Sequence, residues 1–402
     1  MIRKVRSSRG LILLVLLFFL TGCWNRREIE TLGFVLAVGL DKAPEEGKIM
    51  VTVHIAKPFA IAGPSVVDER PFWIISSSGY TVFEAVRNLL ALSPRQPFWA
   101  HTRSLVVGEE LAREGIGSIL DFFFRDGETR ADVHVVIAKG NKASELLEAE
   151  WEQTRMPSEG ALGIMRNSWA RLGTTVDTEL LDFIEMLETP GVEPVAVRED
   201  LLDLPPEGEN LVGELRREAI SKSARISGAA VFNGDRLVGW LGPKQTRGLN
   251  WIRGKVRGTV LVFEQPNLPG QQMTVEVLRA SSKIKPMVTD GRPHVIVEIF
   301  AEGNLGELQG YTDPISQTEL WASFERRFAE VIRNEAESAI DAAKELKADI
   351  FGFGTAFYRN MCCQWERMED NWPEIFSELD VYIDVRADLR RSGQVARRFL
   401  GI

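Results

Sequence analysis

The sequence predicts a mixed α/β (α+β) protein of more than one domain, with β-sheets packed against helices. The chain has 402 residues, and the part after an N-terminal export signal is long enough for two or three domains of about 100–200 residues each. Strand and helix patterns alternate through the first half, as in α/β domains. The second half holds a long amphipathic helical pattern that is followed by a final alternating strand.

Residues 1–22 have the pattern of a lipoprotein signal peptide. Four basic residues precede an unbroken apolar run at 11–20, and small residues follow it. That run is shorter than the about 20 apolar residues needed to cross a bilayer. The next residues, Leu20-Thr21-Gly22-Cys23, are similar to a bacterial lipobox, in which the cysteine thiol receives a diacylglyceryl group and the signal is cut before it.

The lipobox predicts a protein that is exported and tethered to a membrane face by two or three acyl chains, such as palmitate, on Cys23. A simple secretory signal or an N-terminal anchor helix is the alternative interpretation. No second apolar run is long enough to span a membrane, so the lipid is the expected membrane attachment.

The charge of the mature chain argues against nucleic acid as a partner. The signal holds four of the 48 basic residues and none of the 57 acidic ones, which leaves 44 basic against 57 acidic residues, or −13. A strongly acidic balance also disfavours binding to anionic lipid through bulk charge.

Cysteine is scarce, so a disulfide framework is not expected. With Cys23 assigned to the lipid, only the adjacent Cys362 and Cys363 remain. We interpret this pair as two small apolar residues at the end of a helix.

An N-terminal α/β domain is predicted over residues 23–200. Strands are expected at 34–40, 48–56, 71–78, 103–107, 132–138 and 192–197. Helices are expected at 81–92, 109–124, 143–150, 161–170 and 178–188. Residues 201–223, rich in proline, glycine and acidic residues, are interpreted as a linker or surface excursion between the two domains.

A C-terminal α+β domain is predicted over residues 224–392. It opens with a hairpin of strands 225–232 and 236–241 around Asn233-Gly234-Asp235, a strong turn signal. A helix at 244–252 and strands at 255–263, 271–285 and 294–302 follow. The long helix is expected to begin at Asp313-Pro314 and to cover the sheet, and 378–387 forms the closing strand.

No catalytic or cofactor motif is present, so we expect no enzyme activity, no cofactor and no metal site. The four histidines are scattered. His54 and His134 lie inside apolar strands and are expected to be core or sheet residues, whereas His101 follows a proline-rich turn and is a weak candidate for lining a cleft.

Several segments, in order along the chain, resemble the C subunit of GerA-type spore germinant receptors. They are Gly22-Cys23-Trp24-Asn25-Arg26-Arg27-Glu28-Ile29, Gly39-Leu40-Asp41-Lys42, Trp99-Ala100-His101-Thr102-Arg103, Arg125-Asp126-Gly127-Glu128-Thr129-Arg130, Gly228-Ala229-Ala230-Val231-Phe232, Val238-Gly239-Trp240-Leu241, Lys347-Ala348-Asp349-Ile350-Phe351-Gly352-Phe353-Gly354 and the 381–385 strand. Asn25 stands where the family usually has aspartate.

The resemblance implies a mixed α/β protein on the outer face of the spore inner membrane. It also implies a non-enzymatic lipoprotein that acts with a polytopic A subunit and a transporter-like B subunit in nutrient-triggered germination. Whether it binds a germinant directly stays open. The alternative is a lipid-anchored extracytoplasmic solute-binding protein. We interpret Asp349 as a cap and Gly352 and Gly354 as residues that permit a turn or close packing.

Overall fold

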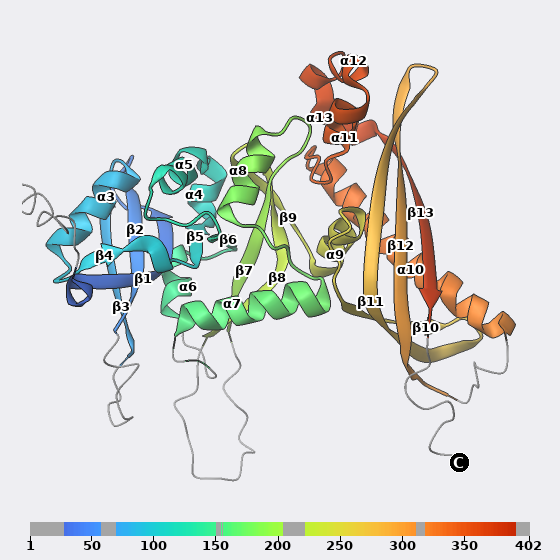
Figure 1. Cartoon of the computed structure of the whole chain (residues 1–402), viewed down its shortest axis with the longest axis horizontal. Helices are drawn as coiled ribbons and strands as arrows, with labels where there is room; N and C mark the ends of the chain where they lie inside the picture. Colours follow the sequence, from blue (N-terminus) through green and yellow to red (C-terminus); the bar gives the residue numbers. More distant parts are fainter. Residues whose placement is uncertain are drawn as a thin grey trace, which may run out of the picture.

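The computed structural model describes residues 28–57, 70–149, 154, 156–203, 222–310 and 318–390, which form two sheets flanked by helices. Figure 1 shows the two sheets at opposite ends of the long axis, with α9 between them. The mixed fold predicted from the sequence is confirmed, including the long helix that precedes a final strand. The signal peptide, Cys23 and the predicted start of that helix at Asp313-Pro314 lie outside the described residues.

The first sheet has the order β3-β2-β1-β5-β6-β7-β8-β9, and β4 also pairs with β1. Neighbours among β1, β5, β6 and β7 run parallel, and β2, β3, β8 and β9 are antiparallel to their neighbours. The strands are β1 (Leu32–Lys42), β2 (Ile49–Ala56), β3 (Phe72–Gly79), β4 (Gln96–Phe98), β5 (Ser104–Gly108), β6 (His134–Ala138), β7 (Val195–Asp203), β8 (Lys222–Asn233) and β9 (Arg236–Leu241).

Helices cover both faces of this sheet because its central strands carry buried apolar residues on both faces. On β5, Leu105 and Val107 belong to the core beneath α3, α4, α5 and α8, whereas Val106 faces α6 and α7. The helices are α3 (Val82–Asn88), α4 (Glu109–Glu114), α5 (Gly117–Arg125), α6 (Ala143–Glu148), α7 (Pro157–Asn167) and α8 (Leu180–Glu188), with short turns η1 (Ile29–Thr31), η2 (Leu89–Ala91), η3 (Trp99–His101) and η4 (Ser168–Leu172).

The single helix predicted at 109–124 is instead two helices, α4 and α5. Gly115 has φ of +124°, which a helix does not accommodate. The Asp235 carbonyl accepts a hydrogen bond from the Ile116 amide at 3.0 Å, and its carboxylate accepts one from Gly117 at 3.1 Å. The loop of the β8–β9 hairpin therefore caps α5 from far along the chain.

The first sheet also continues past the predicted domain boundary at 201–223. The two ends of that segment, 201–203 and 222–223, belong to β7 and β8, which pair as antiparallel neighbours from Val195↔Val231 to Asp203↔Lys222. The predicted hairpin at 225–241 is present as β8 and β9, but it completes the first sheet and does not open the second. The hairpin belongs to the first sheet because β8 pairs with β7, and the amino-acid composition of 201–223 does not reveal this pairing.

The second sheet has the order β10-β11-β12-β13, with β12 and β13 parallel. Its strands are β10 (Thr259–Gln265), β11 (Leu268–Thr289), β12 (Arg292–Leu308) and β13 (Asp380–Leu389). The long helix α10 (Thr318–Glu345) packs its buried Phe324, Phe328 and Ile332 into the core beside this sheet. The short helices α11 (Phe353–Asn360), α12 (Cys362–Trp365) and α13 (Trp372–Glu378), with η5 (Glu369–Asn371), lie at one end of it (Figure 1).

Helix α9 (Pro243–Ile252) joins the two sheets by direct contact with α10. A Cβ on Gly248 would lie 2.0 Å from the Glu335 carbonyl oxygen, so only glycine allows this approach. The buried Glu335 carboxylate pairs with Arg247 and accepts a hydrogen bond from the Trp251 indole at 3.0 Å. Close packing and a buried ion pair therefore hold α9 on the long helix.

Candidate functional site

The predicted lipidation site, Cys23, and the lipobox residues Leu20, Thr21 and Gly22 lie outside the described residues. The described chain begins at Glu28 and passes through η1 into β1. Lipid attachment at Cys23 therefore stays a prediction.

Asp41, in the Gly39–Lys42 segment of the resemblance, fixes the start of α6 to the end of β1. Its carboxylate oxygens accept hydrogen bonds from the amides of Ala143 at 2.7 Å and Ser144 at 3.0 Å. A Cβ at Gly108 would lie 2.3 Å from the Asp41 carboxylate. The Asp41 carboxylate is therefore occupied by backbone amides of α6, and Gly108 is the residue that leaves room for it.

A cleft of about 400 Å³ lies where the parallel strands β1 and β5 end, bordered by the starts of α4 and α6. Ligands of parallel sheets bind at this edge. Two of its carboxylates, those of Asp41 and Glu109, already have partners, and Glu109 accepts hydrogen bonds from the Gly140 amide at 2.7 Å and from Arg113. Burial opposes ionisation of Glu109, but these two donors outweigh it and lower the pKa of the carboxyl.

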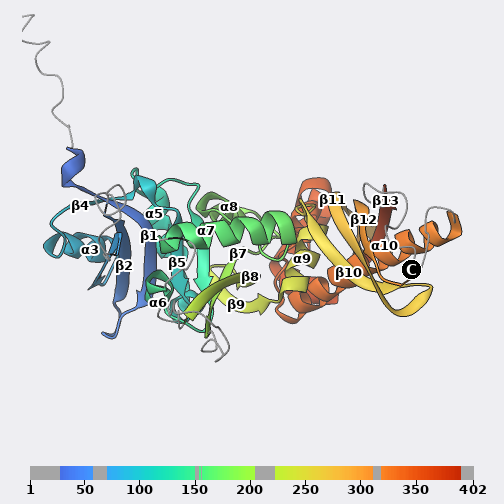
Figure 2. The same ribbon diagram turned by 90° about the horizontal axis from the view of Figure 1, so that it is seen from below.

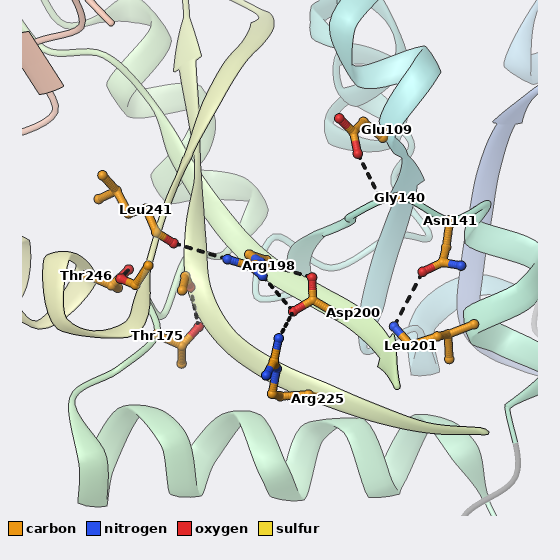
Figure 3. A network of polar contacts seen from close by, with 12 residues as sticks. Glu109, Gly140, Asn141, Thr175, Arg198, Asp200, Leu201, Arg225, Leu241 and Thr246 are labelled. Atoms are coloured by element: carbon orange, nitrogen blue, oxygen red, sulfur yellow. Dashed lines mark hydrogen bonds and ion pairs between the residues drawn. The ribbon is translucent and has the colours of Figure 1, made fainter. Parts of the chain in front are cut away.

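A polar network crosses β7, β8 and β9 beside this cleft (Figure 3). Asp200 accepts two hydrogen bonds from Arg198 at 3.0 Å and one from Arg225 at 3.2 Å. The Arg198 guanidinium also reaches the Leu241 carbonyl at 3.5 Å and lies over the Trp240 ring. The network thus connects the predicted hairpin strands to β7.

Beneath α7, Glu199 is fully buried against an apolar part of the sheet, in a cavity of about 20 Å³ that has room for a water-sized group. Burial, and then the Asp200 carboxylate, raise the pKa of Glu199 to about 8, so this acid holds its proton at neutral pH. The Ser158 hydroxyl in the same cavity has no hydrogen-bond partner in the part of the chain that the structure describes. The sequence does not reveal this site, because an acid just beyond a predicted apolar strand is expected to face solvent.

Asp349 accepts five hydrogen bonds, which confirms its predicted role as a cap. One carboxylate oxygen accepts from the amides of Phe351, Gly352 and Phe353, and the other from the Gly354 amide and the Trp372 indole, all at 2.7–3.1 Å. Burial raises the pKa of Asp349 to about 6, while these donors act in the opposite direction, so the group is ionised at neutral pH.

The two glycines beside Asp349 have the structural roles that the sequence suggests. Gly352 has φ of +78°, in the left-handed region. A Cβ on Gly354 would lie 2.6 Å from the Gly191 Cα and 2.7 Å from the Trp372 indole nitrogen. The motif therefore anchors α11 against the turn before β7.

The remaining residues singled out in the sequence have surface or packing environments. His101 is exposed and packs edge-on against the rings of Phe34 and Phe98. His54 is buried on β2, as expected, and His134 is bonded to Asp177 at 3.1 Å. The cysteine pair at 362–363 lies at the start of the short helix α12 and not at the end of a helix as expected, and both thiols are exposed.

Within the described ranges, no group of three or more acidic, histidine or cysteine side chains is arranged to hold a metal ion. The helices in those ranges also include none with the length and apolar character needed to span a membrane.

Comparison with known proteins gives one consistent result along the chain. A model of the spore germination protein N-terminal domain matches residues 25–198, and the model "Spore germination B3/GerAC like, C-terminal" matches residues 227–393. Spore germination protein KC of Bacillus subtilis (strain 168) is 25% identical over 98% of this chain and 97% of its own length. Spore germination protein B3 of the same organism is 23% identical over 97% and 99%.

A solved structure supports the fold independently. The crystal structure of the GerBC protein superposes with a TM-score of 0.55 and 18% identity, covering 88% of this chain and 96% of that chain.

Proposed function

We propose a function for this chain on the premise that it belongs to the GerAC-like family of spore germination proteins, the germinant receptor C subunits. The proposed function is that of a lipid-anchored, non-enzymatic subunit, which acts with A and B membrane subunits to trigger germination. The observation that carries the proposal is the match of both family models, in order, over the two halves of the chain.

Two further features support this proposal. The sequence Leu20-Thr21-Gly22-Cys23 follows a short apolar run and precedes the matched region, where a lipid anchor would tether the folded part. The polar residues of the family-like segments, such as Asp41 and Asp349, are used to hold secondary structure together. Residues used in this way suit a protein that works by contact with partners and not by chemistry.

The solute-binding alternative has a location but little chemistry to support it. The cleft at the ends of β1 and β5 lies where a ligand of a parallel sheet would bind. The Asp41 and Glu109 carboxylates in it are already hydrogen-bonded to backbone amides of the same chain. Stabilisation of the purified protein against heat by an amino acid or a sugar would favour this alternative.

The lipid anchor is tested by comparing Cys23→Ala with Cys363→Ser, which changes an exposed thiol elsewhere in the chain. Parent and Cys363→Ser should be recovered in the spore membrane fraction, whereas Cys23→Ala should leave it and slow germination. Equal membrane recovery of Cys23→Ala and parent would contradict the anchor.

A further inference from the structure

Several elements at the end of the molecule where the described chain begins carry exposed apolar side chains. Ile29, in η1, is 68% exposed, and Leu92, directly after η2, is 56% exposed. Phe83 of α3 and Leu90 of η2 are 53% and 44% exposed and lie seven residues apart, on one side of a continuous helical turn. Figure 2 shows η1, β4 and α3 at this end and the second sheet at the other. Phe83 and Leu90 line one groove, and exposed apolar side chains that lie close together mark a contact surface.

A groove of about 560 Å³ lies between α3 and α5 within this surface. Phe83 and Phe122 meet edge to face across it, with ring centroids 5.9 Å apart. Its margin carries charges of both signs, from Arg87, Asp121, Arg125, Asp126 and Glu128. Arg125 is paired with Asp121 at 2.7 Å, so the margin has no strongly basic character.

The groove is adjacent to the point where the chain leads toward its N-terminus. Gln96 lines the groove and is the β-sheet partner of Leu32, which directly follows η1. Cys23 precedes Glu28 by five residues, and a fully extended chain of that length reaches about 18 Å. Acyl chains on Cys23 would therefore hold this end of the molecule within about 18 Å of the membrane surface.

We propose that the surface formed by Ile29, Phe83, Leu90 and Leu92, here called the anchor-side surface, lies on the lipid bilayer. The proposal rests on the proposed lipid anchor at Cys23. Apolar side chains at the centre with charges of both signs at the margin suit burial at the boundary of headgroups and acyl chains, and not attraction to anionic lipid. The second sheet then projects away from the membrane along the long axis shown in Figure 2.

The test uses the full lipidated chain in which Cys362→Ser and Cys363→Ser remove the exposed thiols. A single labelling site is then introduced as Leu92→Cys, or as Val262→Cys in the second sheet, where the native side chain is 60% exposed. Each protein carries a polarity-sensitive fluorophore and is incorporated into phosphatidylcholine vesicles, with and without phosphatidylglycerol. Flotation of the vesicles reports the lipid anchor independently of the fluorophore.

We expect the label at position 92 to gain about twofold or more in emission, shifted to the blue, because it leaves water for the bilayer interface. The label at position 262 should keep the emission it has without vesicles. The change at position 92 should persist in high salt and without phosphatidylglycerol, since apolar contact is not screened.

Four results would overturn the proposal, and they differ in what else they affect. Flotation with equal emission at both positions would remove the surface contact but leave the lipid anchor intact. Loss of the position 92 signal in high salt would mean that charge attraction, and not apolar contact, holds this surface on the bilayer. Protection at position 92 only when a receptor membrane subunit is present would assign this surface to a protein partner. Failure to float would reject the anchor and the orientation together.

Discussion

Asp349→Ala is the substitution that most directly tests how the family-like C-terminal segment works. It removes the acceptor of four backbone amides and of the Trp372 indole while leaving the surrounding chain unchanged. The Asp349 backbone carbonyl, which accepts a hydrogen bond from the Glu193 amide at 2.8 Å, is retained. The test therefore isolates the carboxylate that holds α11 in place.

The expected loss of stability follows from two opposing contributions. Five donors left without a partner, at about 1.5 kcal/mol each, cost roughly 7 kcal/mol. Burial penalises the ionised carboxylate strongly enough to keep the pKa of Asp349 at about 6 despite these donors, so removing the carboxylate offsets part of that cost. The net expectation at pH 7 is a decrease of several kcal/mol in the free energy of unfolding, with about 7 kcal/mol as the upper limit.

The measurement is urea-induced unfolding followed by tryptophan fluorescence, with the slope of the transition checked for constancy. Asp370→Ala, an exposed acid in η5 of the same region, is the matched control and should change stability by less than about 0.5 kcal/mol. A parent-like transition for Asp349→Ala, together with loss of receptor assembly, would refute the structural role and make Asp349 a partner-contact residue.

Three further predictions concern packing and buried titratable groups. Gly354→Ala should lower the free energy of unfolding by about 2 kcal/mol or more, because its Cβ would overlap backbone, whereas Gly163→Ala, with open space around it in α7, should be neutral or stabilising by up to about 1 kcal/mol in the same urea assay. Burial raises the pKa of Glu199 from 4.5 to about 8, so the unfolded state releases its proton first and the free energy of unfolding falls as the pH rises from 4.5 to 8. Glu199→Gln should remove up to about 5 kcal/mol of this loss, and parallel curves of stability against pH for parent and variant would contradict the prediction. Burial lowers the pKa of His54 from 6.5 to about 4, so the free energy of unfolding is highest above pH 6.5 and falls by about 3 kcal/mol as the pH drops toward 4. His54→Asn should reduce this fall, and acid unfolding that is the same in parent and variant would count against the prediction.

Local patterns were sufficient to predict most individual elements. Apolar runs on either side of a turn identified β1 and β2, and apolar residues three or four apart identified α3 and α10, because burial in the core determines these elements. The Asn233-Gly234 turn identified the hairpin, where Asn233 pairs with Arg236.

Contacts between distant segments account for what local patterns did not predict. Helix α5 begins where the Gly117 amide donates a hydrogen bond to the carboxylate of Asp235, 118 residues later in the chain. Likewise, β8 joins the first sheet by pairing with β7 across residues 204–221, and no composition signal in that excursion encodes the pairing. Predicting either feature requires knowledge of the tertiary arrangement.

The functional residues divide in the same way. The cap role of Asp349 was predictable because the carboxylate of an acid before a glycine-rich turn can accept hydrogen bonds from the backbone amides of that turn. Glu199 was not predictable, since its burial depends on α7 packing over the sheet. Nor does the sequence show that Phe83 and Phe122, from separate helices, form one groove.

The central claim, that this chain is a germinant receptor subunit, is tested most directly by recovery of the protein from dormant spores in mild detergent and identification of what accompanies it. We expect A- and B-type membrane subunits to co-purify with the parent. They should also co-purify with the Cys363→Ser control, because that thiol is exposed away from both sheets' cores. Recovery of the protein alone in several detergents would contradict the account and favour a free solute-binding protein.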